Sequence, residues 1–217
     1  MTKFKFLALL AFLTGSFCTM QAQSDAEATA LLKKVSAKYK SYTTTTTDFT
    51  ISIHEPEAKT DIIKKGKLFL KGAKFKLQID EVISFCDGKN IWNYLPKEKQ
   101  VQVSLYDKND GSVSPEKIFS IWEKDYMYRI KEKKTLNGKA VSIIELSPAT
   151  NKSASIFKID VTINPATNEL LSFLVYEKNG TRTTYTVNTV IPNTVYADTY
   201  FIFDPKLYKG VEVIELR

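Results

Sequence analysis

Two side chains in this 217-residue chain could act as a nucleophile and its base: Cys86 and His54, the only histidine. Cys86 lies in FCDGKNIWNYLP, residues 85–96, where Asp87 and Trp92 could shape a pocket around it. A nucleophilic thiol needs a base within hydrogen-bond reach. No spacing brings the two together, because His54 lies on the predicted polar face of another strand. Cysteine is often buried for packing reasons alone, so the sequence favours a structural Cys86.

Other catalytic patterns are missing from the sequence. It contains no Cys/His cluster, G-x-S-x-G elbow, phosphate-binding loop or H-E-x-x-H motif. The acidic residues are scattered, without a recurring pair that would suggest acid–base chemistry. We therefore expect no catalytic residues, no metal and no cofactor, and a protein that holds a ligand without transforming it.

The N-terminus has the pattern of a secretory signal peptide. Lys3 and Lys5 precede an apolar run over residues 6–17, and small residues follow. The run is too short to cross a bilayer, which takes about 20 residues. Phe17 occupies the position where a lipid-attachment signal has a small residue, so we do not expect an anchor at Cys18. The prediction is a cleaved signal peptide over 1–22 and one exported domain over 23–217.

The mature chain is expected to have a positive net charge and a single cysteine. Removal of Lys3 and Lys5 lowers the formal charge from +7 to +5. Lysine clusters at 64–67 and 131–134 are typical of a solvated face, although docking to an acidic protein or anionic headgroups is the alternative. Nucleic acid is not expected as a partner of an exported protein. With Cys86 alone, no intrachain disulfide can form, and the core must hold the fold.

A helix is predicted directly after the signal peptide. Ser24 and Glu27 have the spacing of a capping box. Apolar residues follow at helical spacing for about 18 residues. The threonine run 43–47 then favours a strand, because consecutive β-branched residues resist helix formation.

From residue 49 onward the period changes to two, which is typical of antiparallel strands with one polar and one apolar face. Asp87-Gly88, Asn137-Gly138 and Asn179-Gly180 are hairpin turn signals. Together they predict about ten strands. The clearest alternating runs are 49–54, 67–71, 74–79, 100–105 and 157–163.

A second, short helix is predicted to begin at Ser114-Pro115-Glu116, with serine as the cap and proline at the first helical position. Ile118, Phe119 and Trp122 make it unusually apolar. A meander of about ten strands is too wide to stay flat. If two or three helices cannot fill its concave side, an apolar cavity remains; the alternative is that the aromatic residues are simply core.

Five motifs, in order along the chain, resemble the LolA family of periplasmic outer-membrane lipoprotein carriers. The segment 87–103, DGKNIWNYLPKEKQVQV, is similar to the family's D-G-K-x-L/I-W-x-Y hairpin. The others are KSYTTTTTDF at 40–49, GKLFLKGAKFKL at 66–77, SPEKIF at 114–119 and FIFDPKLYKGVEVIE at 201–215.

The resemblance implies a mostly β fold of the α+β class: an incomplete antiparallel β-barrel, formed by a strongly curved sheet, with two or three helices over its concave face. It implies a monomeric, non-enzymatic carrier in the periplasm that moves lipoproteins from the inner to the outer membrane. The implied partners are the acyl chains of lipoproteins, an inner-membrane ABC-type lipoprotein release complex and an outer-membrane acceptor. A lipoprotein sensor or receptor, or a carrier of another lipid, remains the alternative.

Strand alternation, together with the shortage of helices to fill the concave face, suggests which residues meet the ligand. The lid would comprise Ile118, Phe119 and Trp122. Gly72-Ala73 replaces the Arg-Pro of well-studied family members, which leaves the control of such a lid open. The residues expected to line the cavity are Phe49, Ile51, Leu68, Leu70, Phe75, Leu77, Trp92, Tyr94, Val101 and Val103.

Overall fold

The computed structural model describes residues 25–107, 115, 118–149 and 155–216. The predicted signal peptide lies outside the described residues. One α-helix, α1 (Ala26–Lys40), precedes a sheet of twelve strands. The strands are β1 (Thr45–His54), β2 (Ile62–Lys71), β3 (Lys74–Ile79), β4 (Val82–Cys86), β5 (Asn90–Leu95), β6 (Gln100–Leu105), β7 (Tyr126–Leu136), β8 (Lys139–Pro148), β9 (Ile156–Asn164), β10 (Glu169–Glu177), β11 (Arg182–Pro192) and β12 (Glu212–Glu215).

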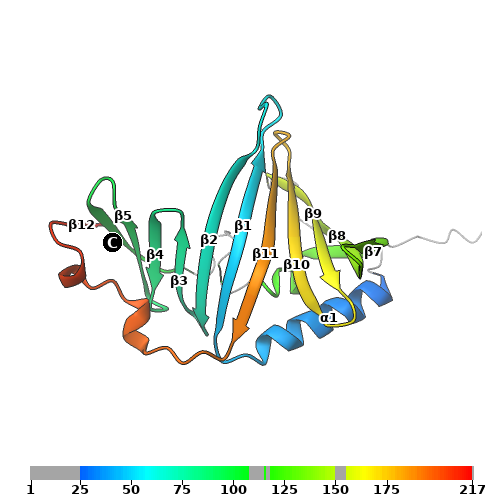
Figure 1. The fold of residues 1–217 in the computed structure, drawn as a ribbon, viewed down its shortest axis with the longest axis horizontal. Helices are drawn as coiled ribbons and strands as arrows, with labels where there is room; N and C mark the ends of the chain where they lie inside the picture. The colour runs from blue at the N-terminus through cyan, green and yellow to red at the C-terminus, as the bar shows by residue number, and fades with distance from the viewer. Residues whose placement is uncertain (1–24, 108–114, 116–117, 150–154, 217) are drawn as a thin grey trace, which may run out of the picture.

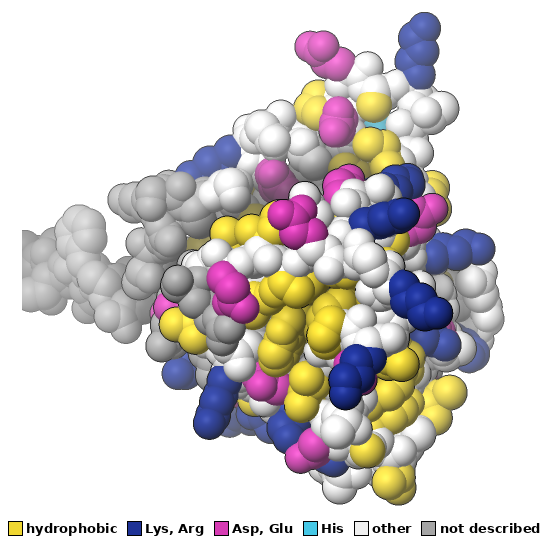
Figure 2. All heavy atoms as spheres, turned by 90° about the vertical axis from the view of Figure 1, so that its left-hand side faces the viewer, with side chains coloured by type: hydrophobic (Ala, Val, Ile, Leu, Met, Phe, Trp, Pro, Cys, Tyr) yellow, Lys and Arg dark blue, Asp and Glu magenta, His cyan; other side chains and the backbone are white. Residues whose placement is uncertain are grey.

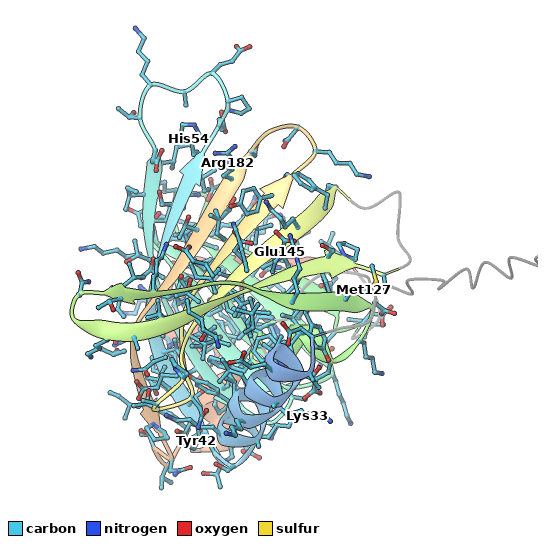
Figure 3. The ribbon with its side chains drawn as sticks, turned by 90° about the vertical axis from the view of Figure 1, so that its right-hand side faces the viewer. Lys33, Tyr42, His54, Met127, Glu145 and Arg182 are labelled. Atoms are coloured by element: carbon cyan, nitrogen blue, oxygen red, sulfur yellow. The ribbon has the colours of Figure 1, made fainter. Side chains whose placement is uncertain are left out.

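All twelve strands form one sheet, in the order β12-β6-β5-β4-β3-β2-β1-β11-β10-β9-β8-β7. Neighbours pair antiparallel, except that β12 lies parallel to β6. The end strands β7 and β12 do not pair with each other, so the sheet is curved but open (Figure 1). The β7–β8 hairpin crosses the direction of the central strands, as Figure 3 shows. The predicted mostly β fold is confirmed, and an incomplete barrel fits it.

Turn residues account for the tight hairpins. Asn137 and Gly138 both have positive φ, 49° and 76°, between β7 and β8, as a two-residue hairpin with the strands' twist requires. Between β4 and β5, the Asp87 carboxylate accepts hydrogen bonds from the backbone N–H groups of Lys89 and Asn90, each at 2.8 Å. The dipeptide Asn179-Gly180 lies between β10 and β11.

The helix α1 begins one residue later than predicted. Asp25 is its N-cap, and its carboxylate accepts from the backbone N–H groups of Glu27 at 2.8 Å and Ala28 at 3.3 Å. These bonds lower the pKa of Asp25 below its ordinary value. The helix has 15 residues and lies at the foot of β9–β11 (Figure 1).

The expectation of two or three helices over the concave face was wrong: the described residues contain one α-helix. Ser114 and Glu116 lie outside them. The following residues 118–120 form a turn, and Ile121–Glu123 form one turn of 3₁₀ helix, η2. β-branched and aromatic residues are modest helix formers, so the apolar residues 118–122 do not by themselves favour an α-helix.

The two faces of the sheet carry separate cores. The inner face packs against α1 and η2 and holds the larger cluster, which includes Leu68, Ile159 and Leu170. The outer face of β4–β6 packs against the C-terminal segment 196–211 and holds a smaller cluster around Phe85 and Phe203. We keep these names, inner face and outer face, below.

The C-terminal segment contains two short 3₁₀ helices, η3 (Asp198–Phe201) and η4 (Pro205–Leu207), before β12. Figure 1 shows it running from β11 across to the opposite end of the sheet. Viewed from that end, apolar side chains gather at the centre of the surface and charged side chains surround them (Figure 2). Among the helices described, none has the length and apolar character needed to cross a membrane.

Candidate functional site

The inner face encloses a cavity of about 330 Å³. Residues from β1, β2, β3, β9, β10 and β11 line it, and Pro115, Ile118, Phe119 and Ile121 cover it. The lining is mostly apolar, with a few polar exceptions. The apolar lining residues include Phe49, Ile51, Leu68, Leu77, Ile79, Ile156, Ile159, Leu170, Phe173, Val175 and Val187, and the polar ones are Thr47, Glu177, Thr183 and Tyr185.

Gly66 leaves the space that the Phe49 ring occupies in one wall of the cavity. Phe49 on β1 pairs with Gly66 on β2, and the phenyl ring lies over the glycine. A Cβ at Gly66 would come within 2.2 Å of Phe49 Cζ, far inside van der Waals contact. Gly66 therefore sets where the Phe49 ring can lie.

The cover over the cavity is fastened to α1. Ile118 and Phe119 line the cavity, and the Phe119 ring stacks on Tyr39 of α1 with centroids 4.0 Å apart. Trp122 of η2 is buried behind them, and its Nε1 donates a hydrogen bond to Ser36 Oγ at 2.9 Å.

An ion pair supports the same junction. Lys40 Nζ lies 2.5 Å from Glu123 Oε1, and this contact lowers the pKa of Glu123. The cover is thus joined to one helix by a stacked pair of rings, one buried hydrogen bond and one exposed ion pair.

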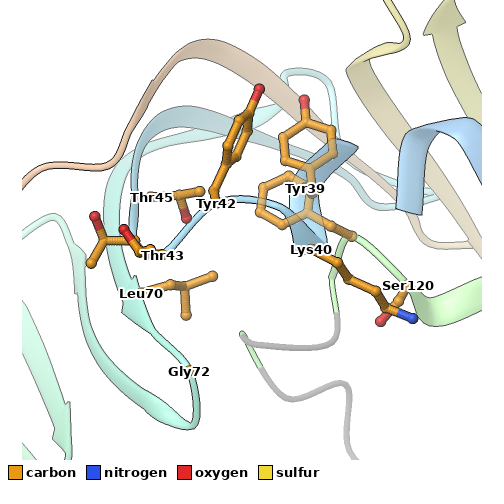
Figure 4. Close-up of a pocket in the computed structure, with 10 residues that line it drawn as sticks. Tyr39, Lys40, Tyr42, Thr43, Thr45, Leu70, Gly72 and Ser120 are labelled. Carbon is orange, nitrogen blue, oxygen red and sulfur yellow. The ribbon is translucent and has the colours of Figure 1, made fainter. Parts of the chain in front are cut away.

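A second pocket of about 220 Å³ adjoins the cavity and shares Phe119 with it. In Figure 4, Thr43, Thr45 and Leu70 lie on one side of this pocket, and Lys40 and Ser120 lie on the other. Its lining carries far more polar groups than the cavity. We call it the polar pocket; its other lining residues are Tyr39, Tyr42, Thr44, Gly72 and Phe119.

Of the ten residues predicted to line a cavity, four do so. Leu70 lines the adjacent polar pocket, and Phe75 is buried in the same inner-face core. Their contact with a ligand stays a prediction. The four that line the cavity are Phe49, Ile51, Leu68 and Leu77.

The other four predicted residues lie on the outer face. Trp92 pairs with Val103 and Tyr94 with Val101, and all point away from the cavity. Tyr94 packs against Tyr208 of the C-terminal segment, with ring centroids 4.6 Å apart. Alternation showed that Val101 and Val103 share the apolar face of β6, but it could not tell that the C-terminal segment covers this face and makes it the outer one.

Sequence reasoning missed the cavity wall formed by the C-terminal half, including Leu170, Phe173 and Val187. Alternation in these strands could have predicted that they have one apolar face. Their place in the cavity wall, however, depends on the pairing of β1 with β11, where Thr45 lies opposite Pro192. No local pattern reveals a pairing across such a sequence separation.

Cys86 and His54 do not form a catalytic pair. Register places Cys86 at the level of Thr45, through Phe75 and Leu70, whereas His54 is nine residues further along β1. At about 3.3 Å per residue, the two are roughly 30 Å apart along the strand. His54 lies at the far tip of its hairpin beside Arg182 (Figure 3).

Each of the two residues has a structural role. Cys86 is buried, and its Sγ accepts from the Gly88 backbone N–H at 3.3 Å. His54 Nδ1 lies 2.9 Å from Asp61 Oδ1. No group of three or more His, Cys, Asp or Glu side chains that could hold a metal occurs in the described part of the chain.

Several solved structures share this fold at low sequence identity. An uncharacterized conserved protein from Thermus thermophilus is 12% identical, with a TM-score of 0.57 over 87% of this chain and 99% of that one. A DUF1329 family protein from Desulfovibrio piger is 13% identical, with a TM-score of 0.50 over 86% of this chain and all of that one. No curated protein sequence matches the chain.

The family model "Outer membrane lipoprotein carrier protein LolA" matches residues 40–204. The match begins at the end of α1, includes every strand from β1 to β11, and so contains the cavity and its cover. Because it spans well over half of the chain, this protein belongs to the LolA family.

Proposed function

We propose that this protein is a periplasmic carrier that shields the acyl chains of lipoproteins in the inner-face cavity while they travel from the inner to the outer membrane. The observation that carries the proposal is the cavity itself: an apolar space on the inner face of an open barrel, partly covered by Pro115, Ile118, Phe119 and Ile121. The family match and the expected signal peptide support the location.

The energetics fit carriage without catalysis. Each buried methylene contributes about 0.8 kcal/mol, so a sixteen-carbon chain is held in a membrane by roughly 12 kcal/mol. A carrier has to offer a comparably apolar surface, after which transfer between the two sites is nearly neutral. The aliphatic and aromatic lining supplies such a surface, and no reacting group is needed.

The cover has to move for an acyl chain to enter. At about 330 Å³, the cavity is at the lower end of the range for ligand sites, about 300–1,000 Å³. Displacing Ile118 and Phe119 would add their volume to it. We propose that these two residues fill the empty site and that Trp122 holds them in place.

The partners follow from the same proposal. An inner-membrane ABC-type release complex would load the lipoprotein, and an outer-membrane acceptor would receive it. The family match supports these two partners. Gly72, where well-studied family members have an arginine, lines the polar pocket. We propose that the contacts with α1 hold the cover in this protein.

The test is purification from the native periplasm, followed by mass spectrometry of bound lipids and lipoproteins. We expect acylated cargo and saturable binding of an apolar fluorescent dye. Absence of both would refute acyl carriage. Recovery of a stable complex with a membrane protein, without cargo, would instead support a sensor or receptor.

A further inference from the structure

Two threonine hydroxyls on the inner face are buried without an acceptor or donor. Thr45 and Thr47 are each 4% exposed, and neither Oγ1 has a hydrogen-bond partner among the described residues. Burying an unsatisfied hydroxyl costs about 1–3 kcal/mol. Two such groups side by side on one strand therefore point to a ligand that satisfies them.

Their position is at the boundary between the two hollow spaces. Thr45 lines the polar pocket, and Thr47 lines the apolar cavity. Register places them opposite Leu70 and Leu68 on β2. Both threonines thus share the inner face, about 7 Å apart along β1.

Thr44 and Thr46, which alternate with Thr45 and Thr47 along the chain, both have hydrogen-bond partners. Thr44 Oγ1 donates to the Thr194 carbonyl at 2.6 Å, and Thr46 Oγ1 lies 2.6 Å from the Tyr196 hydroxyl. The partners of those two hydroxyls belong to the stretch of chain that directly follows β11. The same residue type therefore has partners on one face and none on the other.

The chemistry of the two spaces indicates the orientation of an amphipathic ligand. An acyl chain fits the aliphatic cavity, and a glycerol group fits the polar pocket, where Lys40 and Ser120 lie. The group that joins chain to glycerol is an ester, and its carbonyl accepts hydrogen bonds without offering a donor. Hydroxyl donors at the boundary match that carbonyl.

We propose that Thr45 and Thr47 donate hydrogen bonds to the ester carbonyls of an acylglycerol group, fixing its acyl chain in the cavity and its glycerol in the polar pocket. The proposal rests on the proposed acyl-binding function and deepens it by naming the part of the ligand that is recognised. Phe119, which borders both spaces, moves aside when the ligand occupies them.

The experiment compares two ligands that differ only in the carbonyls: 1,2-dioctanoylglycerol and 1,2-di-O-octylglycerol, each titrated into the mature protein by calorimetry. We expect the wild type to bind the ester about tenfold more tightly, equivalent to about 1.4 kcal/mol. Threonine and valine have similar shapes, so Thr45→Val/Thr47→Val should keep ether binding and lose the ester preference. Thr186→Val, on the outer face of β11 and exposed, is the matched control and should keep that preference.

Thermal unfolding of the empty protein supplies a second readout. Valine removes two unsatisfied hydroxyls, so the double variant should unfold at the same or a higher temperature than the wild type. A clear drop would mean that the hydroxyls have a structural role and would overturn the proposal. Equal binding of ester and ether by the wild type would also overturn it, while acyl carriage would stand. Binding of neither ligand would refute acyl carriage and this inference together.

Discussion

At the scale of single residues, the groups that looked most reactive have structural roles. Cys86 packs against the inner-face core and supports the β4–β5 turn through its bond from Gly88. His54 pairs with Asp61 at an exposed hairpin tip. The polar groups that we propose to contact the ligand are instead the buried Thr45 and Thr47, which no sequence motif marks.

Replacement of Cys86 by alanine tests whether the thiol does more than pack. We expect binding of the apolar dye to remain within twofold of wild type, because Cys86 does not line the cavity. Stability should fall by about 1 kcal/mol from the lost sulfur contacts, measured by urea unfolding. Loss of binding in a folded variant would contradict the structural role.

Asp198 gives stability a defined dependence on pH. Hydrogen bonds from Lys71 at 2.8 Å and Lys74 at 2.6 Å lower the pKa of its carboxyl from 3.8 to about 2. A carboxyl with a lowered folded-state pKa stabilises the fold above pH 4, and this contribution is lost as pH falls from about 4 to 2. Asp198→Asn should therefore flatten the stability profile in that window, as measured by thermal unfolding at each pH.

At the scale of elements, one helix and one short cover segment lie over the inner face, which the sequence predicted to be covered by two or three helices. Ser36 of α1 holds Trp122 of η2, and Tyr39 stacks on Phe119. Burial of the Tyr39 phenol raises its pKa to about 12, and its oxygen accepts a hydrogen bond from the Leu170 N–H at 3.2 Å. The cover is therefore connected to β10 through α1.

Ser36→Ala removes the only side-chain hydrogen bond shown for the Trp122 ring in the described residues. Leaving a buried N–H unsatisfied costs the closed form about 1–3 kcal/mol. We expect ligand release, followed by stopped-flow fluorescence, to become about tenfold faster. The control is Ser41→Ala, because the Ser41 hydroxyl donates to the Lys38 carbonyl at the end of α1.

Trp122→Asp should weaken ligand retention more than Ser36→Ala does, with the sheet still folded. Unfolding of this variant would show that Trp122 has only a structural role in the core.

Gly66→Ala tests the wall of the cavity. The new methyl group cannot coexist with the Phe49 ring in its present place, so the ring must tilt into the cavity. We expect weaker ligand binding and a loss of about 1–3 kcal/mol in stability. Adding Phe49→Leu should relieve the clash and restore part of both. Unchanged ligand binding by Gly66→Ala would contradict the expectation that the Phe49 ring moves into the cavity.

At the scale of the whole molecule, the two faces of the sheet contact different parts of the structure. Its inner face holds the cavity, while the outer face of β4–β6 anchors the C-terminal segment that returns to add β12. An open barrel with edges at β7 and β12 can change its curvature without breaking a closed ring of hydrogen bonds.

A pair of alanine substitutions separates the two faces. Leu77→Ala, at the cavity, should weaken dye binding and destabilise the fold by about 2–5 kcal/mol. Tyr94→Ala, on the outer face, should leave dye binding intact and expose the C-terminal segment to limited proteolysis. Weaker binding by Tyr94→Ala, with the segment still protected, would contradict the face assignment.

The sequence by itself determined the mostly β fold, the family, the hairpin turns and the N-terminal helix, because these depend on local periodicity, turn chemistry and ordered motifs. It predicted Phe49, Ile51, Leu68 and Leu77 on the cavity side for the same reason. Only the tertiary structure decided that Trp92 and Tyr94 face outward, because alternation shows which residues share a face, whereas the C-terminal segment determines which face is the outer one. Likewise, the pairing of β1 with β11 left Thr45 and Thr47 without partners, which depends on contacts between distant segments and not on their own neighbours in the chain.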